Sequence, residues 1–166
     1  MDTIKLPYFG KVKIDKNIVE QDYQTYERFN DTLIEINLIY ETENLNLTDL
    51  SIVKIFLSDI EKYISNAKEA ILLNYQTNEF IKNYIDFHIE ALTPLAKEVL
   101  KEIIPKNVKI EEYFLDDLEL ARIYIFADDE NEFIKFIYNI SEEITDENLF
   151  VRYGKDMLLK EIATEY

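Results

Sequence analysis

The side chains that most often react in enzymes are scarce in this sequence. His88 is the only histidine among 166 residues, and there is no cysteine. A site of several histidines, a thiolate metal site or a cysteine nucleophile therefore cannot form within one chain. His88 falls beside the apolar stripe of a predicted helix, next to Phe87, so we expect it to pack or hydrogen-bond inside the fold.

Carboxylates are the one reactive group in excess, with 34 Asp and Glu residues. Because acids occur throughout the chain, two of them at the spacing of a glycosidase pair carry almost no information. The run from Asp128 to Glu132 could offer oxygen ligands to a hard cation, but it lacks the alternating acids and central glycine of a calcium loop. We interpret this run as a polar turn, and we predict neither a metal nor a cofactor.

The two glycines, Gly10 and Gly154, stand far apart in the sequence. Phosphate-binding loops need several glycines close together so that backbone amides can approach the anion. The sequence therefore excludes nucleotide chemistry of the Rossmann or P-loop type. Gly10 is expected instead to relieve a bulge or kink in the first strand.

The formal net charge of −16 is the strongest global feature. A field of this sign repels nucleic acid and anionic membranes and favours basic partners. The charge is uneven, because residues 107–166 hold 16 acids and 6 bases, a net charge of −10. A surface that attracts a partner by charge is therefore expected in the last third, although acidity that serves only solubility is an open alternative.

Tyrosine among acids is a composition typical of protein-binding surfaces. The chain has 12 tyrosines, and several lie in the acidic last third. Core or half-buried sheet positions are the alternative for these rings. The predicted partner-binding residues are Glu111, Glu112, Tyr113, Asp116, Asp117, Tyr124, Asp128, Asp129, Glu130 and Glu132.

Residues 1–40 are predicted to form strands. Residues 6–15 alternate loosely around Gly10, residues 23–29 are short and aromatic, and residues 32–40 place Ile34, Ile36 and Leu38 on one face. Leu33 makes the second face of this last strand partly apolar, which predicts a central strand rather than an edge strand.

The middle of the chain is predicted to be helical. Apolar residues from Val53 to Ile71 are spaced alternately by four and three, with Thr48 as the expected N-cap. A second helix should begin near Asn78. Thr93 followed by Pro94 predicts the start of a third helix, which ends before Pro105.

The last third is predicted to return to strands after a short helical turn at residues 111–118. Residues 120–126 and 133–140 should form a hairpin around the polar turn, and residues 149–153 and 157–163 should form a second hairpin around Gly154. The order β-β-β, two to three helices, β-β-β-β predicts one α+β domain over residues 1–166. We expect a largely antiparallel sheet of about six to seven strands, with helices packed on one face.

Several short segments, in a consistent order, carry a family resemblance. They are Tyr8-Phe9-Gly10, the helical block from Tyr84 to His88, Phe114-Leu115 leading into Arg122 to Phe126, the run from Asp128 to Phe133, and Ile144-Thr145-Asp146. With these segments the chain resembles the uncharacterised bacterial domain-of-unknown-function family numbered two thousand and four. The resemblance implies a compact α+β domain in bacteria, and it brings no functional residue with it.

Three functional hypotheses follow from the sequence. The first is a non-enzymatic protein-interaction module, in particular an immunity or antitoxin-like inhibitor of a basic toxin. The second is a housekeeping domain whose acidity only confers solubility, and the third is a carboxylate or metal-dependent hydrolase. No apolar run of signal-peptide or membrane-span length occurs, so the chain is expected in the cytoplasm, without nucleic-acid or membrane partners and as a monomer or homodimer.

Overall fold

The fold is α+β, as the sequence predicted, in a computed structural model that describes residues 2–141 and 143–166. The strands are β1 (Asp2–Leu6), β2 (Gly10–Ile14), β3 (Glu20–Phe29), β4 (Thr32–Glu41), β5 (Glu119–Phe126), β6 (Ile134–Asn139), β7 (Asn148–Tyr153) and β8 (Leu159–Glu165). The helices are α1 (Leu47–Ser58), α2 (Ile60–Asn74), α3 (Glu79–Glu90), α4 (Pro94–Ile103) and α5 (Ile110–Asp117).

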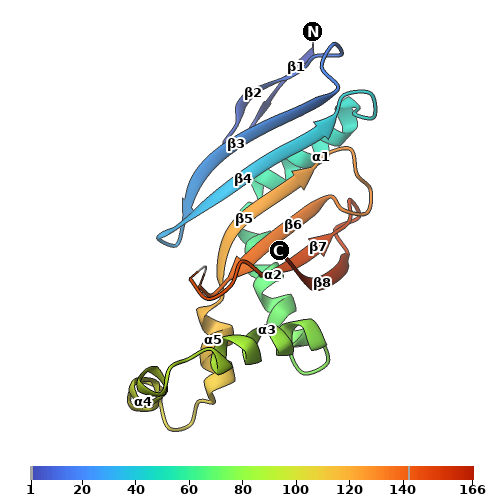
Figure 1. Cartoon of the computed structure of the whole chain (residues 1–166). Helices are drawn as coiled ribbons and strands as arrows, with labels where there is room; N and C mark the ends of the chain where they lie inside the picture. The colour runs from blue at the N-terminus through green and yellow to red at the C-terminus, as the bar shows by residue number, and fades with distance from the viewer. Residues whose placement is uncertain (1, 142) are drawn as a thin grey trace.

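Strands β3 to β8 form one six-stranded sheet in the order of the sequence. Every neighbouring pair in it is antiparallel except β4 and β5, which are parallel. Parallel strands cannot be joined by a tight turn, so the helical segment between β4 and β5 supplies the crossover. Figure 1 shows α1 and α2 behind the sheet, with α4 and α5 at the end of the molecule farthest from β1 and β2. As predicted, β4 lies inside the sheet.

The helical segment differs from the prediction, because five helices replace the expected two to three. The single apolar stripe from Val53 to Ile71 is divided at Asp59, whose backbone (φ −117°, ψ 24°) leaves the helical region. The apolar spacing continues across this break, so periodicity could not reveal it. The helical turn expected near Glu111 is the full helix α5.

The first predicted strand is a hairpin. Residues 7–9 form a tight turn in which Tyr8 has a φ of 64°, and Gly10 follows with a φ of 70°. Gly10 therefore ends a turn, where its positive φ is tolerated, and does not relieve a bulge. Strands β1 and β2 pair as a separate two-stranded sheet, and Leu6 and Val12 bury their side chains in the main core.

The main core lies between the six-stranded sheet and the helices. Ile36 on β4 and Ile123 on β5 are register partners, and both are fully buried, as are Val53 and Leu57 on α1. Each such side chain contributes about 1.5–3 kcal/mol by leaving water. The other face of the sheet holds a small cluster of Ile137, Phe150 and Ala163, against which Tyr124 packs.

Two of the three expected helix starts are confirmed. The side chain of Asn78 accepts a hydrogen bond from the amide of Ile81 (3.1 Å), and Thr93 accepts one from Ala96 (3.2 Å). The expected cap at Thr48 is wrong, because Asn46 caps α1 and Thr48 lies inside its first turn. Asn46 is the favoured cap because its own backbone amide also donates a hydrogen bond to the Asp49 carboxylate (2.8 Å), which completes a capping box.

Candidate partner-binding site

The ten predicted partner-binding residues do not form one surface. Glu111 to Asp117 lie on α5, immediately before β5, whereas Asp128 to Glu132 follow β5 in the turn toward β6. The eight residues of β5 separate the two groups, which corresponds to roughly 25 Å of extended chain. Figure 1 shows the two groups at opposite ends of β5, so each must be assessed separately.

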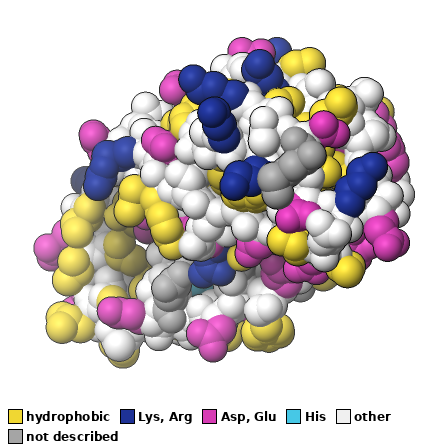
Figure 2. Space-filling view, turned by 90° about the horizontal axis from the view of Figure 1, so that it is seen from above, with side chains coloured by type: hydrophobic (Ala, Val, Ile, Leu, Met, Phe, Trp, Pro, Cys, Tyr) yellow, Lys and Arg dark blue, Asp and Glu magenta, His cyan; other side chains and the backbone are white. Residues whose placement is uncertain are grey.

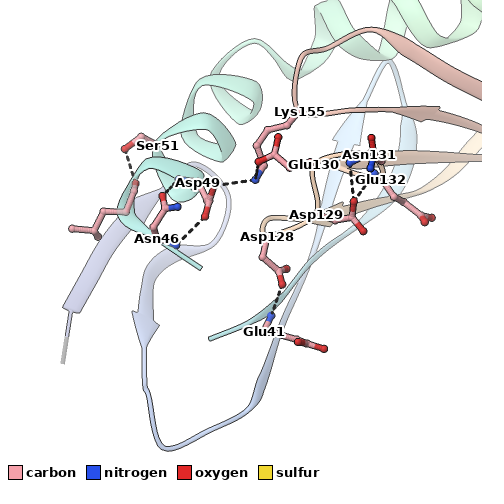
Figure 3. A network of polar contacts seen from close by, with 11 residues as sticks. Glu41, Asn46, Asp49, Ser51, Asp128, Asp129, Glu130, Asn131, Glu132 and Lys155 are labelled. Carbon is pink, nitrogen blue, oxygen red and sulfur yellow. Dashed lines mark hydrogen bonds and ion pairs between the residues drawn. The ribbon is translucent and has the colours of Figure 1, made fainter. Parts of the chain in front are cut away.

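The acids of the β5–β6 turn hold the turn in shape. Asp129 Oδ1 accepts hydrogen bonds from the backbone amides of Asn131 and Glu132, both at 2.8 Å, and Asp128 accepts one from the amide of Glu41 (3.3 Å). Figure 3 shows these carboxylates directed toward backbone nitrogens. Such side-chain bonds to nearby amides are the usual work of aspartate in a turn.

The glutamates of the same turn contact cations of the protein itself. Glu130 lies 3.0 Å from the Nζ atom of Lys155, and Glu132 lies 3.5 Å from both Lys135 and Arg152. The negative charge of this group is thus largely compensated within the fold. That leaves little of it to attract a partner.

Lys155 joins distant parts of the chain. Its Nζ atom lies 2.9 Å from Asp49 Oδ1, and both side chains are only 7% exposed. Burial alone would lower the pKa of Lys155, but its hydrogen bonds and charge interactions with Asp49 and Glu130 hold that pKa above the ordinary value. The ammonium group thereby ties the start of α1 to the β5–β6 and β7–β8 turns (Figure 3).

Gly154 allows these two turns to approach each other. Its backbone is buried, and a Cβ atom added there would lie 3.0 Å from the carbonyl oxygen of Glu130. The next amide, that of Lys155, donates a hydrogen bond to this same oxygen at 2.9 Å. Gly154, which was predicted to lie in a hairpin, is therefore required for the close packing of one backbone segment on another.

The acids of α5 are placed differently, on the surface. Glu112, Asp116 and Asp117 are exposed and Glu111 is half-buried. Glu112 accepts a hydrogen bond from the amide of Lys109 (3.3 Å) at the start of the helix. Asp116 and Asp117 occupy the last turn, which contains no basic residue. Negative charge is unfavourable there, because the helix dipole is negative at its C-terminus.

Acids from other elements join those of α5 in space. Burial raises the pKa of Tyr75, and the charges of Glu111, Asp86 and Glu112 raise it further. Asp86 belongs to α3, so the charges of carboxylates from two helices act on the half-buried Tyr75. This tyrosine was missed by the sequence analysis, because it precedes the acidic last third by more than thirty residues.

Lys68 contacts the C-terminal end of α5. Its Nζ atom donates hydrogen bonds to the carbonyl oxygens of Leu115 and Leu118, both at 2.7 Å. Burial lowers the pKa of Lys68, and the charges of Asp116, Asp117 and Glu119 offset this only in part. Lys68 thus caps the helix end without forming an ion pair.

We call the resulting surface the acidic face. It consists of Asp86, Glu111, Glu112, Asp116, Asp117 and Glu119. In the described part of the chain none of these six carboxylates forms an ion pair with a basic side chain. In the view of Figure 2, by contrast, acidic, basic and hydrophobic side chains are intermixed.

The two predicted tyrosines lie apart from each other. Tyr113 is half-buried and packs edge-on to Phe114, under the acidic face. Tyr124 stacks on Phe126, on the sheet face that carries the small cluster, away from the helices. The structure therefore places Tyr113 near the α5 acids but does not bring Tyr124 to them.

His88 is fully buried in α3, where its Nδ1 atom lies 2.8 Å from the carbonyl oxygen of Tyr84. The two rings also pack against each other, with centroids 4.5 Å apart. Across residues 2–141 and 143–166, no group of three or more histidine, aspartate or glutamate side chains is placed to hold a metal ion. No observation therefore favours the metal-dependent form of the hydrolase hypothesis.

No family model, curated protein or solved structure matches the chain. The resemblance to the uncharacterised bacterial family therefore stays a prediction. Among the described residues, no helix has both the length and the apolar character that crossing a membrane requires.

Proposed function

We propose that the protein is a non-enzymatic interaction module that binds a basic protein through its acidic face. The observation that carries this proposal is the set of six carboxylates on α3, α5 and the start of β5 that form no ion pair with any described residue. The acids of the β5–β6 turn, which are bonded within the fold, serve as the contrast. Asp116 and Asp117 support the proposal further, because the helix dipole disfavours negative charge at the C-terminal end on which they lie.

The mechanism is electrostatic steering followed by desolvation of a few contacts. A surface of one sign raises the rate at which a partner of opposite sign is captured, and the gain falls as salt screens the charges. The carboxylates would occupy positions that phosphates take in the cleft of a nuclease or a similar cationic enzyme. An immunity or antitoxin-like inhibitor of a basic toxin is the specific form of this proposal, and the half-buried Tyr75 would be its aromatic contact.

The experiment captures the partner from lysate of the source cells and then measures its affinity. The test variant is Glu112→Gln, Asp116→Asn, Asp117→Asn. The matched control is Asp2→Asn, Glu20→Gln, Asp22→Asn, three exposed acids on β1 and the start of β3, at the other end of the molecule, with the same change in charge. We expect the captured protein to be basic and its dissociation constant to rise only with the test variant.

A captured partner that both variants bind equally well, or that tolerates molar salt, would contradict the proposal. The proposal would also be contradicted if every protein captured by the unaltered chain were captured equally by the test variant. In either case the protein would be a domain whose acidity serves solubility.

A further inference from the structure

Helix α4 is the most weakly packed element of the fold. None of its ten residues is buried. Leu95, Val99 and Ile103 follow one another along its outer side and are 71%, 46% and 61% exposed. Leu100 lies on its inner side and packs partly against the core. An amphipathic helix normally buries such an apolar stripe, so this helix is incompletely covered.

A groove separates α4 from the helices on either side of it in the chain. Its volume is about 360 Å³, within the range of 300–1,000 Å³ that is usual for small-ligand sites. Apolar side chains form most of its wall. They are Ile89 of α3, Leu100 of α4, Ile104, Pro105 and Val108 of the connection, and Ile110 of α5.

Among the described residues, the charged side chains that line the groove are Lys97, Lys101 and Lys106. Lys97 and Lys101 are one helical turn apart and so lie on the same side of α4. None of the three forms an ion pair within the described residues, although the chain has 34 acids. Residues 94–109 contain four lysines and two glutamates, which makes this segment locally basic in a chain of net charge −16.

We propose that this groove binds a small anionic amphiphile, a monomeric medium-chain carboxylate of the fatty-acid type. The apolar wall would cover the hydrocarbon chain, and the three ammonium groups would hold the carboxylate. Each part of the lining matches one part of the ligand, since charge-assisted bonds fix the head and buried apolar area supplies most of the binding free energy.

The net negative charge of the protein favours a single amphiphile molecule over a membrane surface as the ligand of the groove. An anionic bilayer would face the whole field of the acidic protein, which repels it. One carboxylate brings one charge to a local cluster of lysines. This inference is independent of the proposed function, because the groove residues are not members of the acidic face.

The test is calorimetric titration of the intact protein with decanoate below its micellar concentration. We expect saturable binding of one molecule per chain, and much weaker binding of decyltrimethylammonium, which has the same chain but a positive head. The variant Lys97→Gln, Lys101→Gln, Lys106→Gln should weaken decanoate binding on the order of tenfold or more. The matched control is Lys5→Gln, Lys11→Gln, Lys13→Gln, in exposed positions of β1 and β2, and it should bind as the unaltered protein does.

A second pair of variants tests the apolar wall. Leu100→Gln alters the groove, whereas Leu95→Gln alters the exposed outer side of the same helix, and circular dichroism verifies that both remain folded. Only Leu100→Gln should weaken decanoate binding. Equal binding of the two head groups, no saturable binding, or equal effects of the paired variants would overturn the inference, as would binding to anionic vesicles but not to monomeric decanoate.

Discussion

Charged residues of this protein differ in how deeply they are buried with their ion-pair partners. Asp49 and Lys155 are both nearly buried and contact each other at 2.9 Å, while Glu130, the second partner of Lys155, is 76% exposed. Breaking a buried pair leaves one charge without compensation, which costs far more than losing a contact at the surface. Loss of the Asp49–Lys155 pair and loss of the Glu130–Lys155 pair should therefore have very different effects on the free energy of unfolding.

We expect Lys155→Met to lower the free energy of unfolding by about 3 kcal/mol or more, because the Asp49 carboxylate stays buried without its cation. Glu130→Gln should cost less than about 1 kcal/mol. Urea denaturation of both variants measures the difference. Equal midpoints for the two variants would show that the Asp49–Lys155 pair does not hold α1 to the turns.

Tyrosine hydroxyls set the response of the protein to alkali. Burial raises the pKa of Tyr84 to about 12, while the nearby backbone of Ile140 opposes the rise and the charge of Glu147 adds to it. Burial raises the pKa values of Tyr40 and Tyr138 as well. A pKa raised on folding gives stability that is fully present below the unfolded value of 10 and is lost as the pH rises through the folded value.

Tyr84→Phe isolates one of these hydroxyls, because the ring is kept and only the titrating group is removed. Between pH 10 and pH 12 the unaltered protein should lose about 2 kcal/mol more stability than the variant does. Denaturant titrations at a series of pH values measure this. Parallel pH profiles for the two proteins would mean that the Tyr84 hydroxyl titrates normally in the fold.

At the scale of elements, regular patterns could be predicted from the sequence and their interruptions could not. The alternation of Ile34, Ile36 and Leu38 predicted the interior strand β4, and Thr93-Pro94 predicted the start of α4. The break at Asp59 stayed hidden because the apolar spacing continues through it. The acidic face was predicted only in part, since Asp86 and Tyr75 reach the α5 acids through packing that no local pattern encodes.

Helix α4 should be the helix that opens most readily. Local unfolding is cheapest where few apolar contacts are lost, and α4 has no buried residue. We expect its amides to exchange with deuterium much faster than those of α1, whose Leu50, Val53 and Leu57 are fully buried. Hydrogen exchange followed by mass spectrometry measures both helices in one experiment, and equal protection would contradict this picture of the fold.

At the scale of the whole molecule, the net charge of −16 opposes the compact state. Self-repulsion of this kind weakens as salt screens the charges, so added sodium chloride should raise the urea midpoint. A urea midpoint that stays constant or falls as sodium chloride is added would contradict this account of the net charge.

The ratio of two dissociation constants tests the proposed function most directly. It compares the captured basic partner bound to the Glu112→Gln, Asp116→Asn, Asp117→Asn variant with the same partner bound to the Asp2→Asn, Glu20→Gln, Asp22→Asn control. At low salt the ratio should lie between about tenfold and a hundredfold, since each exposed charge contributes up to about 1 kcal/mol, and it should shrink toward one as salt is raised. A ratio near one at low salt would show that the acidic face does not bind the partner.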